Sequence, residues 1–148
     1  MSVDSPATPK LNKRLYTAEA TVQGGRNGHV RSSDGIIDMD TRPPVELGGP
    51  GGATNPEQLF AAGYSACFQS ALLTVGRREQ VDTSGSTVTG RVTLGTIDGG
   101  AFNVAVALEV HIPDVDLDRA RELVEKAHAV CPYSNATRGN VEVDLSVV

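Results

Sequence analysis

The sequence is poor in cysteine, in runs of like charge and in long apolar segments, and each shortage excludes a class of protein. Its 148 residues contain two cysteines and no CxxC pair, which argues against a disulfide framework. The formal charge is −5, and no run of like charge exceeds a few residues, so neither nucleic acid nor an anionic membrane is expected as a partner. No segment approaches the roughly 18 uninterrupted apolar residues of a membrane span. The two cysteines therefore need an explanation other than a structural scaffold.

The chain is expected to form one domain after a short lead-in. Residues 1–10, MSVDSPATPK, are polar, contain two prolines and lack the apolar core of a signal peptide, so a disordered segment is predicted there. Residues 11–148 are predicted to form a single domain, and 39% apolar residues suffice for a core without metal or disulfide bonds. A soluble, cytoplasmic protein is expected.

Strand patterns on both sides of two helical segments indicate the fold class. The segment RLYTAEATV alternates as a strand does, and the turn residues QGGRNG that follow predict a hairpin with Arg26 at its tip. The segments STVTGRVTLGTI and FNVAVALEVHI, separated by DGGA, predict a long antiparallel hairpin. This order favours an α+β fold over a wound parallel sheet. The expected strands are 14–22, its hairpin partner, 35–40, 86–97, 102–112 and 141–148.

The segment after residue 54 carries the signals of a helix that contains Cys67. Asn55 is a suitable N-cap, and Pro56 suits the first helical position. Glu57 lies in the positively polarised first turn, and Gln58 can complete a capping box. The spacing of apolar residues predicts that Cys67 faces the core. The stripe comprises Phe60, Tyr64, Cys67, Phe68, Ala71, Leu72 and Val75.

A second helix is predicted between Pro113 and Pro132. Its apolar stripe ends on Cys131, and Pro132 is expected to stop the helix. Each cysteine is thus predicted on the buried face of a helix. The stripe comprises Leu117, Ala120, Leu123, Val124, Ala127 and Cys131.

Considered alone, a cysteine on an apolar helix face is more often a small hydrophobic residue than a nucleophile. A metal site is not expected, because Cys67 and Cys131 lie far apart in sequence and the pair His128 and Cys131 supplies only half a zinc site. A cysteine hydrolase would need His128 as its base, and a partly exposed helix residue is the better interpretation of that histidine. The GGPGGATN loop lacks the Gly-Lys-Ser/Thr ending of a phosphate loop.

Three segments carry a resemblance to a known family. They are GGRNGHVRSSDG, LGGPGGATNPEQLFAAGYSACF and VCPYSNATRGNVEVDL, in this order and spacing. The chain resembles the organic hydroperoxide resistance proteins of the Ohr/OsmC superfamily from about Leu15 to its C-terminus. The resemblance implies an OsmC/Ohr-like α+β fold, with antiparallel sheets packed around central helices in an intertwined homodimer.

The resemblance also implies a thiol peroxidase. Carried over to this sequence, it makes Cys67 the peroxidatic thiol and Cys131 the resolving thiol, with Arg26 and Glu57 as a polar pair that organises the site. It implies organic hydroperoxides, including those of fatty acids, as substrates, and a dithiol such as a protein-bound lipoyl group as reductant, without a bound cofactor. An apolar approach that includes Phe68 would favour such substrates. The alternative is a non-enzymatic protein of the same superfamily that senses redox state or binds a lipid-like ligand.

These residue types suit the reduction of a peroxide. A thiolate must attack one peroxide oxygen, and burial on an apolar helix face raises the pKa of a thiol. A guanidinium such as that of Arg26 stays charged and can contact both the thiolate and the departing oxygen. The carboxylate of Glu57 can orient that guanidinium in a two-pronged pair. The sulfenic acid formed at Cys67 can then condense with Cys131.

The spacing of Glu57 and Cys67 predicts how the site is assembled. They are ten residues apart, which places them about 15 Å apart along a continuous helix. They can share a site if the helix kinks at Gly63, or if two copies of the helix cross antiparallel near Ala62. The small residues around Ala62 favour a close crossing. A homodimer is therefore predicted in which Arg26 and Glu57 come from the partner of the chain that supplies the thiols.

Overall fold

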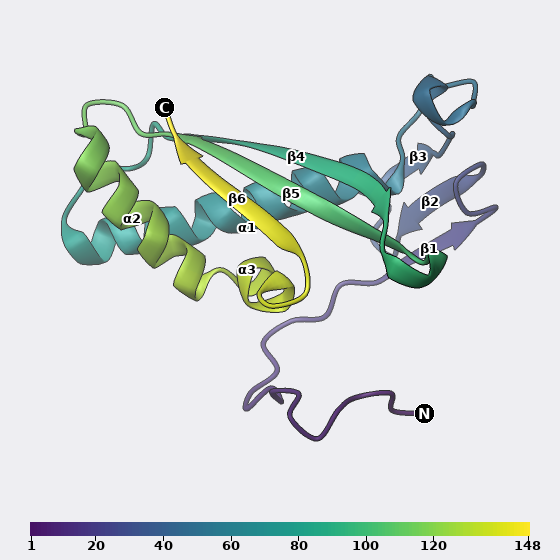
Figure 1. Ribbon diagram of the computed structural model, residues 1–148, viewed down its shortest axis with the longest axis horizontal. Helices are drawn as coiled ribbons and strands as arrows, with labels where there is room; N and C mark the ends of the chain where they lie inside the picture. Colours follow the sequence, from purple (N-terminus) through teal and green to yellow (C-terminus); the bar gives the residue numbers. More distant parts are fainter. The chain divides into compact units, whose positions relative to one another are not determined.

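The computed structural model describes all 148 residues and divides into two compact units, Met1–Thr54 and Asn55–Val148 (Figure 1). The first unit carries Arg26, and the second carries both cysteines together with Glu57. The α+β class is confirmed, because each unit has its own three-stranded sheet and the second adds three α-helices.

The first unit is an antiparallel sheet of three short strands, β1 (Ala20–Gln23), β2 (His29–Ser32) and β3 (Asp38–Asp40), in that order. A short 3-10 helix, η1 (Val45–Leu47), follows. The first strand begins later than the predicted 14–22, because β2 offers only four residues for it to pair with.

The first unit buries little of its apolar surface. Only Val30 and Thr41 are buried among its residues, and β1 is exposed along its whole length. A three-stranded sheet of this size needs a further apolar surface to cover it. The large hydrophobic residues exposed in this unit are Met1, Val3, Leu11, Leu15, Tyr16, Val22, Ile36, Ile37, Met39, Val45 and Leu47.

The second unit is built on the sheet β4 (Thr87–Thr96), β5 (Phe102–His111) and β6 (Glu142–Val147), in that order. The first two strands form the predicted hairpin, which turns through the 3-10 segment η2 (Asp98–Gly100). Strand β6 runs parallel to β5. This sheet is therefore mixed, whereas an antiparallel sheet was expected. The reason is the helical connection from β5 to β6, which returns the chain to the end of the sheet where β5 began.

Three helices complete the second unit: α1 (Pro56–Glu79), α2 (Leu117–Val130) and α3 (Pro132–Thr137). As predicted, Asn55 caps α1, since its side chain accepts a hydrogen bond from the Gln58 N–H. Pro132 ends α2 as expected, and it also opens the short α3, which the sequence pattern did not predict.

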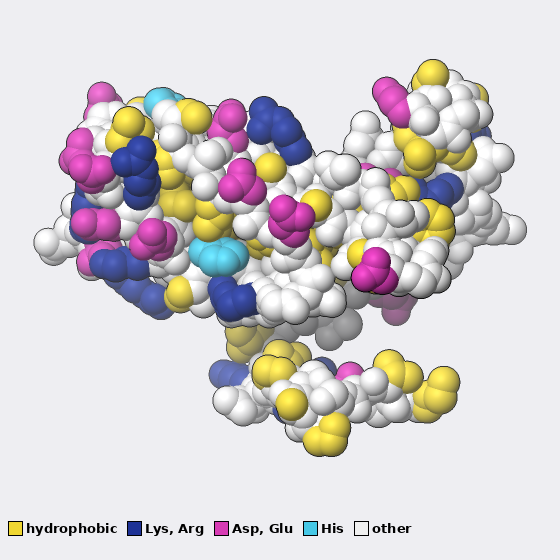
Figure 2. All heavy atoms as spheres, in the orientation of Figure 1, with side chains coloured by type: hydrophobic (Ala, Val, Ile, Leu, Met, Phe, Trp, Pro, Cys, Tyr) yellow, Lys and Arg dark blue, Asp and Glu magenta, His cyan; other side chains and the backbone are white.

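The core of the second unit lies between the sheet, α1 and α2. Alternate residues of each strand face it, for example Leu108 on β5 and Leu145 on β6. The stripe of α2 is buried except for Leu117, which is 50% exposed at the first turn. Charged side chains cover the outer face of α2 (Figure 2). The fully buried large side chains are Tyr64, Phe68, Leu72, Leu108, Leu123, Val110, Cys131 and Ser134.

Helix α1 is apolar on more than the face that meets the core. It is long enough to cross a membrane, and one 18-residue window in it has a mean hydropathy of 1.3. Its central aromatic residues, however, are packed in the core of the second unit. The outward positions Ala62, Ala66 and Ser70 are exposed and uncharged. This outer face of α1 therefore differs from the charged outer face of α2.

Candidate active site

The structure brings the two cysteines together. Cys67 lies in the middle of α1 and is partly buried, and Cys131 is fully buried at the junction where α2 ends and α3 begins. Their sulfur atoms are 3.7 Å apart, and both thiols are free. A small movement would bring two sulfurs at this separation to bonding distance.

The surroundings of Cys67 in the second unit keep its thiol protonated. Burial raises the pKa of Cys67 and is the largest influence, and the neighbouring Cys131 thiol raises it further. The backbone N–H of Tyr133 donates a hydrogen bond to the sulfur and lowers the pKa, but the net direction is upward. A thiolate at this position therefore needs a positive charge beside it.

Three aromatic rings form a cluster between the first half of α1 and the start of α3. Phe60, Tyr64 and Tyr133 contact one another, with ring centroids between 5.7 and 6.1 Å apart. Tyr133 is 40% exposed and Phe60 is partly exposed, so both present apolar surface to the outside. Phe68, which was predicted to line the substrate's approach, is instead 0% exposed, because its position in the helical stripe points into the core.

A buried network of hydroxyl groups ties α3 to α1 and α2. The Tyr64 hydroxyl hydrogen-bonds the hydroxyls of Ser134 at 2.9 Å and Thr137 at 3.1 Å. Ser134 in turn contacts His128 Nδ1 at 2.8 Å, and burial lowers the pKa of His128 below its usual value. The sequence analysis missed this network, although Ser134 and Thr137 are spaced to share one helix face.

Glu57 and Cys67 are not close within one chain. Helix α1 is unbroken from Pro56 to Glu79, so no kink at Gly63 shortens the distance of about 15 Å along its axis. Gly63 instead lets the helix approach Tyr133, since a side chain added there would lie 3.3 Å from the Tyr133 hydroxyl. Glu57 is partly buried in the first turn of α1.

Arg26 lies in the β1–β2 loop of the first unit, as the hairpin prediction expected. It is partly buried. The catalytic roles of Arg26 and Glu57 remain predictions, as do those of the two thiols. No group of three or more His, Cys, Asp or Glu side chains is arranged to hold a metal ion.

Residues 49–146 match the family model described as OsmC-like protein. The chain belongs to the Ohr/OsmC family. An organic hydroperoxide resistance protein from Xanthomonas axonopodis pv. citri is 49% identical to this Ohr/OsmC chain over 137 residues, which cover 91% of this chain and 96% of that protein.

Solved structures of Ohr/OsmC proteins share the fold. The crystal structure of an organic hydroperoxide resistance protein from Legionella pneumophila has a TM-score of 0.87 and 52% identity, and covers 91% of this chain and 98% of that one. A Vibrio cholerae structure, described as a putative organic hydroperoxide resistance protein with captopril bound in one of the active sites, has a TM-score of 0.89 and 46% identity. The match covers 93% of this chain and 95% of that one.

Proposed function

We propose that this chain reduces organic hydroperoxides to alcohols through thiol chemistry at Cys67. The observation that carries the proposal is the pair of free sulfurs 3.7 Å apart in a chain whose relatives are named organic hydroperoxide resistance proteins. Two thiols at this separation can pass between a dithiol and a disulfide without a metal or a cofactor.

The reaction balances in three steps. The Cys67 thiolate attacks one oxygen of ROOH, so that a sulfur–oxygen bond forms, the oxygen–oxygen bond breaks and RO⁻ leaves to take a proton. The sulfenic acid on Cys67 then condenses with the Cys131 thiol, which forms the disulfide and releases water. Two electrons and two protons from an external dithiol restore both thiols. We propose protein-bound lipoyl groups as that dithiol and the cytoplasm as the compartment.

Arg26 supplies the positive charge that Cys67 needs in this proposal. The raised pKa of Cys67 is the supporting observation, because nothing in the second unit favours its ionised form except the N–H of Tyr133. A guanidinium beside the sulfur would lower the pKa and would also stabilise the negative oxygen that leaves. Glu57 is proposed to hold that guanidinium in place.

A second copy of the chain is proposed to complete each site. Glu57 lies far along α1 from its own Cys67, and the exposed stripe of Ala62, Ala66 and Ser70 would let another α1 cross closely. The uncovered apolar side chains of the first unit also favour a partner surface. In an antiparallel crossing, Glu57 of one chain lies beside Cys67 of the other.

The decisive experiment follows the consumption of tert-butyl hydroperoxide with dihydrolipoamide as reductant. The wild type is expected to turn over many times, and Cys67→Ser to consume no peroxide. Cys131→Ser is expected to stop after one or two equivalents per chain, the second of which forms sulfinic acid. A wild type that reacts only once would support the sensing or ligand-binding alternative. Full turnover by Cys67→Ser would refute the assignment of the peroxidatic thiol.

Subunit exchange tests whether sites are shared between chains. Cys67→Ser and Arg26→Ala chains are each expected to be inactive, and a mixture of them is expected to recover one working site per heterodimer. The heterodimer can be isolated with two different affinity tags. No recovery in an isolated heterodimer would refute the contribution of Arg26 from the partner.

A further inference from the structure

We propose that Thr41 is a positioning residue that holds the loop of Arg26 in its working conformation. The inference rests on the proposed function, in which Arg26 acts on the thiolate of Cys67. Thr41 follows β3 directly and is only 3% exposed. It is one of two buried residues in the first unit. A buried hydroxyl in such a unit is expected to have specific partners.

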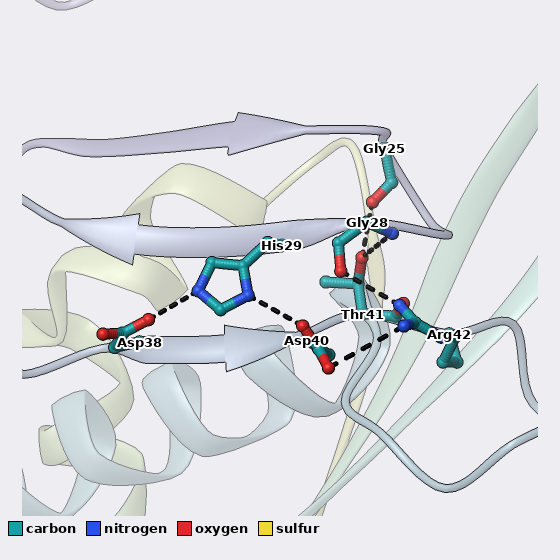
Figure 3. Close-up of polar contacts among 7 residues, drawn as sticks. All are labelled: Gly25, Gly28, His29, Asp38, Asp40, Thr41 and Arg42. Carbon is teal, nitrogen blue, oxygen red and sulfur yellow. Dashed lines mark hydrogen bonds and ion pairs between the residues drawn. The ribbon is translucent and has the colours of Figure 1, made fainter.

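The Thr41 hydroxyl bonds the Arg26 loop on both sides of the arginine. It donates a hydrogen bond to the Gly25 carbonyl at 2.8 Å and accepts one from the Gly28 N–H at 2.9 Å (Figure 3). The backbone of Thr41 adds a bond from its own N–H to the Gly28 carbonyl at 2.9 Å. The peptide that precedes Arg26 and the peptide between Asn27 and Gly28 are thus anchored to one buried side chain.

The backbone of this loop is rich in glycine. Three of the residues from 24 to 28 are glycine, and Gly24 and Gly25 have φ values of +82° and +58°. Glycine lowers the cost of these conformations but leaves the chain free to adopt many others. Within the loop, one backbone hydrogen bond joins the Asn27 N–H to the Gly24 carbonyl. The hydrogen bonds from Thr41 therefore restrict a segment whose glycines allow many backbone conformations.

Arg42 forms a second anchor beside the first. Its Nη1 donates to the Gly28 carbonyl at 3.1 Å and also to the Thr41 carbonyl, and its Nη2 lies 3.7 Å from Asp40. Asp40 also contacts His29 Nδ1 at 2.8 Å (Figure 3). The end of the Arg26 loop is thereby linked to both β2 and β3.

The test removes the hydroxyl while keeping the side-chain volume. The rate of the first reaction of Cys67 with tert-butyl hydroperoxide is measured in a single turnover and across pH, for Thr41→Val and Thr41→Ser. Because a small misplacement of a charged group can cost orders of magnitude in rate, Thr41→Val is expected to react about tenfold more slowly and with a higher apparent pKa. Thr41→Ser keeps the hydroxyl and is expected to stay within about twofold of the wild type.

Arg26→Ala separates failure of this inference from failure of the proposed function. If Arg26→Ala reacts as fast as the wild type, the role of Arg26 is wrong, and the positioning role of Thr41 falls with it. If Arg26→Ala is slow while Thr41→Val is as fast as wild type, only the positioning role is refuted. The double variant is expected to be no slower than Arg26→Ala alone, since the two residues act through one guanidinium.

A second variant covers the case in which Thr41→Val does not fold. Circular dichroism checks the fold of each variant, and Arg42→Met removes the second anchor while leaving the Thr41 hydroxyl in place. It is expected to slow the reaction of Cys67 about threefold, by loss of the charge-assisted bond to Gly28. An unchanged rate in a folded Arg42→Met, with Thr41→Val unfolded, would overturn the inference.

Discussion

The Tyr64 hydroxyl is predicted to stabilise α3, the short helix that begins after Cys131, the proposed resolving thiol. It bonds two hydroxyls of α3, those of Ser134 and Thr137, and Tyr64 itself is fully buried in α1. The N-cap of α3 is Cys131, and its first turn contains the Tyr133 N–H that contacts Cys67. Tyr64→Phe removes the link between the two helices and keeps the aromatic ring.

The loss of stability in Tyr64→Phe depends on which hydrogen bonds Ser134 and Thr137 retain. After the change, Ser134 still contacts His128, and Thr137 still donates to the Ser134 carbonyl. Neither hydroxyl is left without a partner, so the loss is that of hydrogen bonds rather than of a stranded polar group. When both partners keep another hydrogen bond, the loss of two buried hydrogen bonds lowers the free energy of unfolding by about 1–2 kcal/mol. The melting temperature is expected to fall by about 3–8 °C.

Calorimetry of the reduced protein measures this loss, with Tyr133→Phe as the matched control. The Tyr133 side chain is partly exposed, and its hydroxyl takes no part in the buried network, so its removal should change the melting temperature little. The Tyr64→Phe variant should also form its disulfide more slowly after oxidation. Equal destabilisation by both variants, or none by Tyr64→Phe, would refute the role assigned to the network.

Three further predictions concern packing, pH and overoxidation. Gly90→Ala should lower the free energy of unfolding by about 1–3 kcal/mol, because the new methyl would lie 2.4 Å from a hydroxyl oxygen on α1. Urea denaturation measures this loss, and Gly95→Ala, at a position in the same strand with open space around it, is the control. Hydrogen bonds to the carboxylates of β3 are the main reason that the pKa of His29 is raised. The contribution of protonated His29 to folding stability should therefore be complete below pH ~6.5 and lost as the pH rises through the raised pKa. Burial lowers the pKa of His128, so stability should fall as pH drops below ~6.5 toward the lowered value; NMR titration gives both values, and shifts in the same direction would contradict this. Cys131→Ser should accumulate sulfinic acid on the remaining thiol under excess peroxide, as mass spectrometry would detect; an unoxidised thiol would count against a resolving role.

The local signals of helix α1 were sufficient to predict it. Asn55, Pro56 and the apolar stripe determine where the helix starts and which face it buries, and these are properties of neighbouring residues. The direction of β6 could not be predicted in this way, because alternation of apolar residues defines the faces of a strand but not its orientation. Nor did the pattern predict α3, because Pro132 both stops one helix and starts the next.

Sequence periodicity alone predicted part of the site. It placed Cys67 and Cys131 on buried faces, but only the family resemblance paired them, since contact between distant segments depends on how the helices pack. The apolar stripe predicts that Phe68 lies in the core, and its side chain is 0% exposed there. Tyr64 was counted as an apolar residue, and its hydroxyl partners lie about seventy residues later in the chain.

In the proposed mechanism, two reagents compete for the sulfenic acid on Cys67: the fixed Cys131 thiol and a second molecule of peroxide. In its proposed resolving role, the Cys131 thiol, held 3.7 Å from the Cys67 sulfur, would act as a reagent at very high local concentration, since intramolecular reactions of well-placed groups reach effective molarities of about 10⁵ M or more. A second peroxide molecule competes for the sulfenic acid only at its own, far lower, concentration in solution. In the proposed mechanism, the separation of the two sulfurs therefore limits how much peroxide the protein can meet before Cys67 is permanently oxidised.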